Sequence, residues 1–129
     1  MKRRTCSSTH GQSLVEFALI VPLLLLIVFM LLDLGRAVYY YSVIYNAARE
    51  GARYGIIHPS DTAGIDAAAR ELAIGLDPSD LIITSSNPSE TTIQVTATYR
   101  FRIITPLVEI FLGRTQIDLD STALMIIEK

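Results

Sequence analysis

The hydrophobic positions of this chain are concentrated near its N-terminus. Residues 17–32 contain no charged residue and no Ser, Thr, Asn or Gln, and extending the run back to Leu14 adds only Glu16 as a polar member. As a helix, the nineteen residues 14–32 would extend about 28 Å, close to the thickness of a bilayer's hydrocarbon core. A core helix should have a polar face, and a secretory signal should have a shorter apolar run before small residues at a cut site. The pattern therefore predicts a transmembrane helix.

Beyond this span, residues 34–57 continue the helical pattern and carry small side chains on one face. Ala47, Gly51 and Gly55 are four residues apart, and Ala48 and Ala52 lie beside them. Small residues at this spacing allow another backbone to approach closely. This small-residue stripe could pack helix against helix with a partner subunit, or it could pack on the chain's own sheet. We favour the second arrangement, because a helix this close to a globular domain usually receives that domain on its small-residue side.

The remaining residues predict a second helix and three strands. A helix over 62–76, capped by Asp61 or Thr62, would turn four apolar residues inward and pair Asp66 with Arg70. The four apolar residues are Ile65, Ala69, Leu72 and Leu76. Residues 81–84 form a short β-rich run, 87–89 resemble a turn, and 92–103 alternate between apolar and polar as a half-buried strand does.

The chain ends with a further turn and strand. Thr105 and Pro106 predict a short helical turn that ends at Gly113, and alternate residues from 117 to 127 form the apolar face of a last strand. Together these elements predict an α+β fold: a long N-terminal transmembrane helix that extends into a small external domain. We expect that domain to have an antiparallel sheet of about three strands and one or two short helices.

The distribution of charge predicts the orientation in the membrane. Lys2, Arg3 and Arg4 precede the span, whereas Arg36 is the only basic residue close behind it. This excess places the N-terminus in the cytoplasm and the C-terminal domain outside. Cys6, the only cysteine, then lies on the reducing side. The tyrosines just after the span suit a membrane–water boundary, and an adhesive role is a less favoured alternative; they are Tyr39, Tyr40, Tyr41 and Tyr45.

No set of residues predicts catalysis. His10 lies ahead of the span and His58 precedes Pro59 in a loop, while Asp118 and Asp120 fall on the polar face of a strand. The sequence has no glycine-rich phosphate loop, nucleophile motif or Cys/His cluster. Its net charge of −2 provides no overall basic field for nucleic acid. We therefore expect neither an enzyme nor a binder of metal, cofactor, small-molecule substrate or nucleic acid.

The junction before the span contains the most specific motif. Gly11, Gln12 and Ser13 are followed by Leu-Val, Glu16 and Phe17. An acid there can be an interfacial residue favoured by the helix dipole, but the whole run resembles a prepilin peptidase site. That resemblance implies cleavage between Gly11 and Gln12, with Glu16 as the fifth mature residue. Cleavage would expose an ammonium at Gln12, one helical turn from Glu16, and would change the formal charge from 11 − 13 = −2 to 8 − 13 = −5 before the new terminus is counted.

Residues 11–55 resemble the TadE-like family of minor pilins or pseudopilins in tight-adherence, Flp-type pilus systems. Besides the junction, the resemblance is carried by Pro22-Leu-Leu-Leu, Gly35-Arg36 and the Asn-Ala-Ala-Arg-Glu-Gly-Ala-Arg-Tyr block at 46–54. It implies a pilin-like fold, cleavage by a prepilin peptidase and co-assembly through the N-terminal helix. The implied partners are the peptidase, other pilins or pseudopilins, platform proteins of the assembly machinery and the membrane.

The expected organisation has four parts. Residues 1–11 form a basic leader, 12–34 the transmembrane helix, 35–58 its external continuation and 59–129 a small α+β extracytoplasmic domain. The expected location is the bacterial inner membrane, with a single span and possible association with the pilus after processing. The alternative is an uncleaved single-pass scaffold or surface-attachment subunit, and a membrane-tethered enzyme is the least favoured interpretation.

Overall fold

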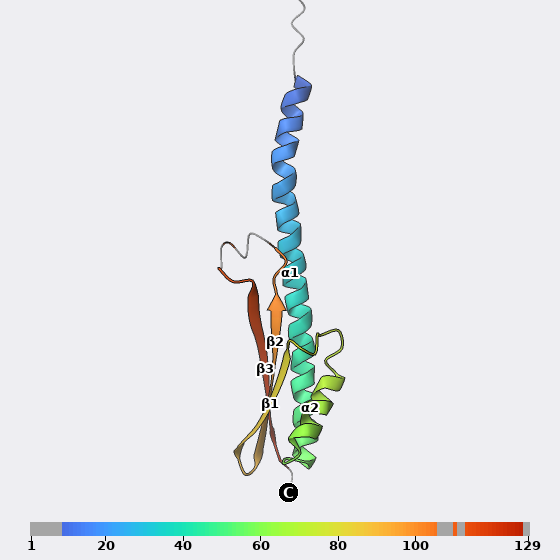
Figure 1. Ribbon diagram of the computed structural model, residues 1–129, viewed down its shortest axis with the longest axis vertical. Coiled ribbons are helices and arrows are strands. Elements are labelled where there is room, and N and C mark those ends of the chain that lie inside the picture. The colour runs from blue at the N-terminus through green and yellow to red at the C-terminus, as the bar shows by residue number, and fades with distance from the viewer. Residues whose placement is uncertain (1–8, 106–109, 111–112, 128–129) are drawn as a thin grey trace, which may run out of the picture.

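The computed structural model describes residues 9–105, 110 and 113–127. A single 49-residue helix, α1 (Thr9–Ile57), forms the long axis of the molecule, and a small head packs against only its C-terminal half (Figure 1). The head consists of α2 (Thr62–Glu71) and the strands β1 (Leu81–Ser89), β2 (Thr92–Arg102) and β3 (Gln116–Ile126). The predicted α+β fold with a three-stranded antiparallel sheet is confirmed.

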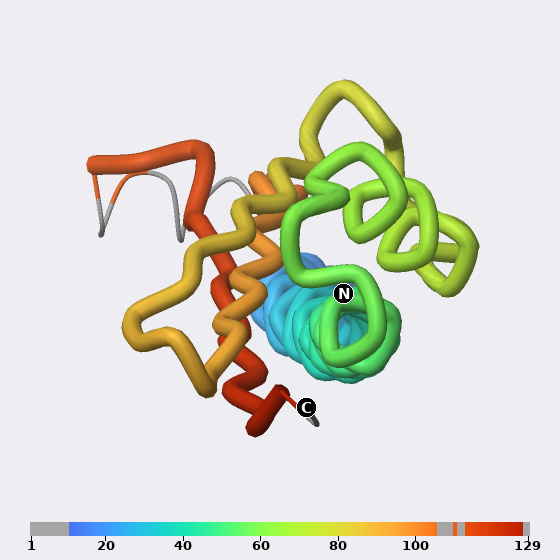
Figure 2. Tube along the Cα trace, turned by 90° about the horizontal axis from the view of Figure 1, so that it is seen from below, coloured from blue at the N-terminus to red at the C-terminus, as the bar shows by residue number. Residues whose placement is uncertain are grey.

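The sheet has the order β1-β2-β3, with both neighbouring pairs antiparallel. Alternate residues of the central strand β2 are buried, as the sequence predicted, and they form the centre of the core: Ile93, Val95, Ala97, Tyr99 and Phe101. Both helices cover this apolar face, and the opposite face of the sheet is open (Figure 2). The core therefore lies between the C-terminal half of α1, α2 and one face of the sheet.

The helix α2 begins where the sequence predicted but ends earlier. Its N-cap is Asp61, and the Asp66–Arg70 ion pair forms at 2.8 Å. The helix stops at Glu71 instead of continuing to residue 76, and Leu72 is 41% exposed. The chain then turns through Gly75, whose positive φ of 82° suits glycine, and the turn carries Leu76 into the core. Leu76 is thus buried from a turn, not from a helical stripe.

The strand β1 is longer than the sequence indicated. The turn predicted at residues 87–89 is wrong, because β1 continues to Ser89 and reverses into β2 only after it. The register between β1 and β2 shifts between Ser86 and Ser89, where Pro88 cannot donate a hydrogen bond to the sheet. An edge strand tolerates such an irregularity. The helical turn predicted from Thr105 to Gly113 lies mostly outside the described residues.

Candidate functional site

The residues of the motif at 11–17 lie at the free end of α1. Gly11, Gln12, Glu16 and Phe17 are all exposed, and Phe17 retains 67% of its surface. A Cβ at Gly11 would meet no atom within 4 Å. Because α1 begins at Thr9, the Gly11–Gln12 bond lies in the first helical turn. A peptidase that binds an extended substrate must therefore unwind only the end of a helix, which frays most easily.

The helix is bare over the whole apolar run. Side chains from 11 to 32 are exposed, except that Val21 and Leu26 are half-buried. Among the described residues, α1 is the one helix long and apolar enough to cross a membrane, and none of its most apolar window is buried. Pro22 lies inside this continuous helix. The head leaves the predicted transmembrane helix free to contact lipid or other helices.

The small-residue stripe lies inside the head. Ala47, Ala48, Gly51, Ala52 and Gly55 are all buried. A Cβ at Gly51 would stand 3.1 Å from Cβ of Ala69 on α2 and 3.2 Å from Val95 on β2. At these positions, helix–helix packing is therefore with α2 of the same chain, and β2 closes the other side. This placement agrees with the arrangement on the chain's own sheet that we favour from the sequence.

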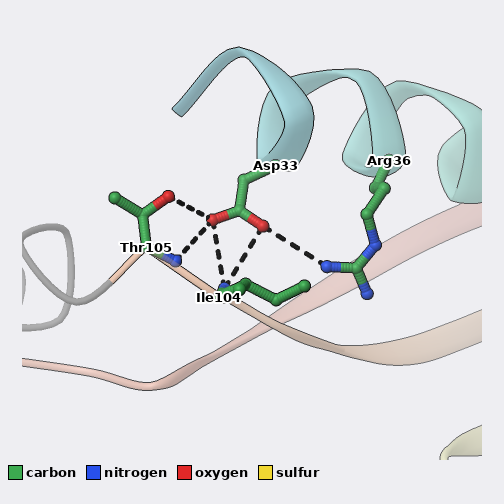
Figure 3. Close-up of polar contacts among 4 residues, drawn as sticks. All are labelled: Asp33, Arg36, Ile104 and Thr105. Atoms are coloured by element: carbon green, nitrogen blue, oxygen red, sulfur yellow. Dashed lines mark hydrogen bonds and ion pairs between the residues drawn. The ribbon is translucent and has the colours of Figure 1, made fainter. Parts of the chain in front are cut away.

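Asp33 joins the end of the apolar run to the head. Its side chain is largely buried, and its carboxylate accepts hydrogen bonds from the backbone N–H of Thr105 at 2.8 Å, from its hydroxyl at 2.6 Å, and from the N–H of Ile104 at 3.0 Å (Figure 3). Arg36 adds an ion pair at 3.3 Å. We call these four residues the Asp33 junction. It fixes the chain beyond β2 to α1 at the last residues of the apolar run.

Sequence reasoning missed the Asp33 junction. The sequence shows Asp33 only as a neighbour of Arg36, because its other partners lie 71 and 72 residues later in the chain. The available signal was the acid itself: a carboxylate at the end of an apolar run is costly unless donors satisfy it. That signal indicates that partners exist, but not where they lie.

Aromatic rings pack beside the Asp33 junction. The ring of Tyr40 lies 5.2 Å from that of Tyr99 and 5.8 Å from that of Phe101, both in edge-to-face geometry. The guanidinium of Arg36 lies 5.2 Å from the ring of Phe101. Tyr40 therefore belongs to the contact between helix and sheet, whereas Tyr39, Tyr41 and Tyr45 of the predicted boundary set are exposed.

The described groups with shifted pKa values outside the apolar run stabilise turns. The backbone N–H of Gly64 and the hydroxyl of Tyr54 both bond to Asp61 at 3.0 Å and lower the pKa of its carboxyl. The same contact raises the pKa of Tyr54, and its ring stacks on His58 at 4.9 Å. Hydrogen bonds from Ser79 lower the pKa of Asp77. The Tyr54–Asp61 bond links α1 to the N-cap of α2, whereas Asp77 bonds within its own turn, so these groups do not form a common reactive centre.

The described residues contain no group of three or more His, Cys, Asp or Glu that could hold a metal ion. Asp118 and Asp120 are exposed on the outer face of β3, and Arg100 approaches Asp118 only to 3.9 Å. The features that the structure assembles are therefore a bare apolar helix, a buried stripe and the Asp33 junction.

Comparison with known proteins agrees with the sequence resemblance. The family model described as TadE-like protein matches residues 11–53. The match includes the motif at 11–17, the apolar run and most of the small-residue stripe. No curated protein and no solved structure matches the chain. The match covers the helix that is long and apolar enough to cross a membrane, and both fit a single-pass membrane protein with a C-terminal domain. Over residues 11–53, the chain therefore matches the TadE-like family, the same family that its sequence resembles.

Proposed function

We propose that this protein is a minor pilin or pseudopilin of a tight-adherence, Flp-type pilus. A prepilin peptidase cuts it after Gly11, and the mature chain assembles with other pilins through its N-terminal helix. The observation that carries the proposal is the position of the motif at residues 11–17. Gly11, Gln12 and Glu16 lie at the free end of an apolar helix that the head leaves uncovered.

The shape of the molecule suits this role. Between Leu14 and Leu32 only Glu16 is polar, so this part of the helix has few polar partners to lose when it leaves lipid for a bundle of similar helices, and packing can favour the transfer. The head covers only the C-terminal half of α1 (Figure 1). Neighbouring copies could therefore bring their apolar halves together without collision between those halves and their own heads.

Charge pairing gives Glu16 its role in assembly. Cleavage places an ammonium on Gln12, four residues before the Glu16 carboxylate, and residues at this spacing are neighbours on a helix. In a bundle of apolar helices the attraction between these charges is stronger than in water, because the local dielectric is low. The carboxylate can pair with the amine of its own chain or with that of a neighbouring chain. Removing residues 1–11 also removes Lys2, Arg3 and Arg4, which hold the leader at the cytoplasmic surface.

Processing can be tested by co-expression with a prepilin peptidase. We expect mass spectrometry to find Gln12 as the first residue of the membrane protein, and Gly11→Val to retain the leader, because a branched side chain opposes close backbone approach in the protease cleft. Gly35→Val is the matched control, since a Cβ at Gly35 also meets no atom within 4 Å, and it should be cut normally. Recovery of Met1 on the wild-type protein in a host with active peptidase would overturn processing.

The role of Glu16 can be tested separately from cleavage. Glu16→Gln keeps the shape of the side chain and removes its charge, so we expect cleavage and membrane insertion to persist while pilus assembly falls. Glu90→Gln is the control, because Glu90 is exposed at the turn between β1 and β2. Unchanged piliation in Glu16→Gln cells would contradict the proposed pairing.

The alternative is an uncleaved single-pass scaffold or surface-attachment subunit of the same machinery. It requires only the membrane helix and the head, and it assigns no special role to Gln12 or Glu16. Under this alternative, the Gly11→Val protein would keep its leader and still support piliation. Under the proposal, the same protein would remain in the membrane as an unassembled precursor.

A further inference from the structure

The Asp33 junction places part of the head at the depth where the apolar run ends. Leu32 is the last residue of that run, and Asp33 directly holds the backbone N–H groups of Ile104 and Thr105. Asp33, Ile104 and Thr105 must therefore lie at nearly the same level along α1 (Figure 3). The end of β2 points toward the bare half of the helix (Figure 1).

That level lies at the outer membrane boundary if residues 14–32 are the span, and deeper if the exposed tyrosines mark the headgroups. If residues 14–32 fill the hydrocarbon core, they extend about 28 Å and leave Asp33 at its outer edge. If the exposed Tyr39 and Tyr41 mark the headgroup level instead, Asp33 lies deeper by about two helical turns. In both cases Ile104 is at or below the headgroups.

The side chains at this end of the head suit a phospholipid surface. Ile104 is apolar but keeps 62% of its surface exposed, although the backbone beside it is held by Asp33. Arg102, at the end of β2, and Arg114, just before β3, are both exposed. The N–H of Ile103 donates a hydrogen bond to the carbonyl of Thr115 at 3.1 Å, which keeps these two segments together. Hydrogen bonds from Ser79 are the main cause of the lowered pKa of Asp77, and the charge of Arg102 lowers it further, so one acid already lies within electrostatic reach of Arg102.

We propose that this edge of the head, formed by Arg102, Ile104 and Arg114, is a second membrane contact that rests on the outer surface of the bilayer crossed by α1. Ile104 enters the apolar side of the headgroup layer, and the two arginines face lipid phosphates, as in interfacial segments that combine apolar and basic residues. The contact fixes the tilt of the head relative to the membrane while the chain is resident there.

The inference does not depend on cleavage at Gly11, so its test needs neither a peptidase nor a pilus. The chain contains no tryptophan, so single tryptophan reporters can be introduced in the full-length protein. The reporter is Ile104→Trp, and the control is Ile126→Trp, which replaces a residue that is 72% exposed and pairs with Thr92 at the opposite end of the sheet. Each variant is placed in nanodiscs of phosphatidylcholine, with and without bromine high on the acyl chains.

We expect bromine to quench the fluorescence of the Ile104→Trp protein and to leave that of the Ile126→Trp protein unchanged. We also expect the Ile104→Trp protein to emit at the shorter wavelength. Equal emission and equal lack of quenching in the two variants would overturn the lipid contact. Equal quenching of both would also overturn it, since it would show that the whole head collapses onto the bilayer. Circular dichroism of each variant checks that the exposed substitutions leave the fold intact.

The role of the arginines is measured by changing the lipid charge. Replacing part of the phosphatidylcholine with phosphatidylglycerol should increase quenching of the Ile104→Trp reporter, and the double change Arg102→Gln and Arg114→Gln should abolish the increase. Arg49→Gln and Arg53→Gln together are the matched control, because these two arginines lie on α1 further from the membrane. An unchanged response to phosphatidylglycerol after the Arg102 and Arg114 substitutions would overturn the assignment of these two residues.

Discussion

At the scale of single residues, Asp33 shows how a costly group becomes a structural one. An acid at the edge of an apolar span is unfavourable when its oxygens lack donors. Here three N–H or O–H groups of Ile104 and Thr105 satisfy the carboxylate, and Arg36 adds a partly exposed ion pair. The same bonds give acceptors to the backbone N–H groups of Ile104 and Thr105, which would otherwise lie against α1 without a hydrogen bond.

We expect Asp33→Ala to lower the free energy of unfolding of the head by about 2 kcal/mol, because it leaves buried N–H donors without an acceptor. The measurement is thermal or urea unfolding of the full chain in detergent micelles, followed by circular dichroism. Arg36→Gln should cost less, under about 1 kcal/mol, because the ion pair it removes is partly exposed. Identical unfolding curves for wild type and Asp33→Ala would contradict the stabilising role of the Asp33 junction.

Asp61 gives a prediction for pH. Its folded-state pKa lies below its ordinary value, because Gly64 and Tyr54 donate hydrogen bonds to the carboxylate. The stability that it contributes is therefore present above the unfolded pKa of about 3.9 and is lost as the pH falls through the lower folded pKa. We expect the difference in melting temperature between wild type and Asp61→Ala to shrink steadily below about pH 4.

The variant Asp61→Asn separates charge from capping, since Asn also caps helices well but does not titrate in this range. The difference between Asp61→Asn and Asp61→Ala should stay constant as the pH is lowered. A wild-type advantage over Asp61→Ala that persists unchanged at the lowest pH would show that the carboxylate charge is not involved.

At the scale of elements, α1 is one helix in two environments. Its first half is apolar on every side and is bare, whereas its second half buries a stripe of small residues against α2 and β2. The stripe matters because an added carbon at its glycines would meet packed neighbours. At Gly51 the added carbon would approach backbone as well as side chains, because a Cβ there would lie 3.3 Å from the carbonyl oxygen of Ile65.

We expect Gly51→Val to lower the free energy of unfolding by about 1–3 kcal/mol, the usual cost of overpacking a well-filled core. The same substitution at Gly35 should be nearly neutral, because no atom lies within 4 Å of the new Cβ and the helix loses a flexible residue. Both variants are compared by unfolding in micelles. Equal stability of the two would show that α1 and α2 are less closely packed than the structure indicates.

At the scale of the whole molecule, the head and the span are joined through α1 and the Asp33 junction. The basic residues before the span predict a cytoplasmic N-terminus and an external head. This orientation is a prediction that labelling can test, because the chain contains Cys6 and no other cysteine.

We expect a membrane-impermeant maleimide, added to spheroplasts of a host without prepilin peptidase, to leave Cys6 of the wild-type protein unlabelled. In a Cys6→Ser background, Ser86→Cys should be labelled, because Ser86 is exposed on the head. Permeabilised cells should label both proteins, which controls for reactivity. Labelling of Cys6 in closed spheroplasts, with no labelling of the Ser86→Cys protein, would reverse the proposed topology.

Local pattern was sufficient for some of the fold. The alternation from Ile93 to Phe101 identified the buried face of β2, and the run of apolar residues identified the bare half of α1. Local pattern was insufficient for chain reversals. Pro88 indicates a turn but lies in an edge strand, and Leu76 fits a helical stripe but is buried from a turn at Gly75. Whether a proline or an apolar residue ends an element depends on which neighbour is packed beside it.

The sequence alone determined the helix that can span a membrane, the motif at Gly11 and Glu16, and the alternation of the strands, because each depends on residues close together in the chain. Only the tertiary structure decided that the small-residue stripe packs on α2 and β2, and that Asp33 binds residues 71 and 72 positions later. The physical reason is the same in both cases. Spacing along a chain defines which side chains share a face, but the partner of a face is chosen by packing across the whole fold.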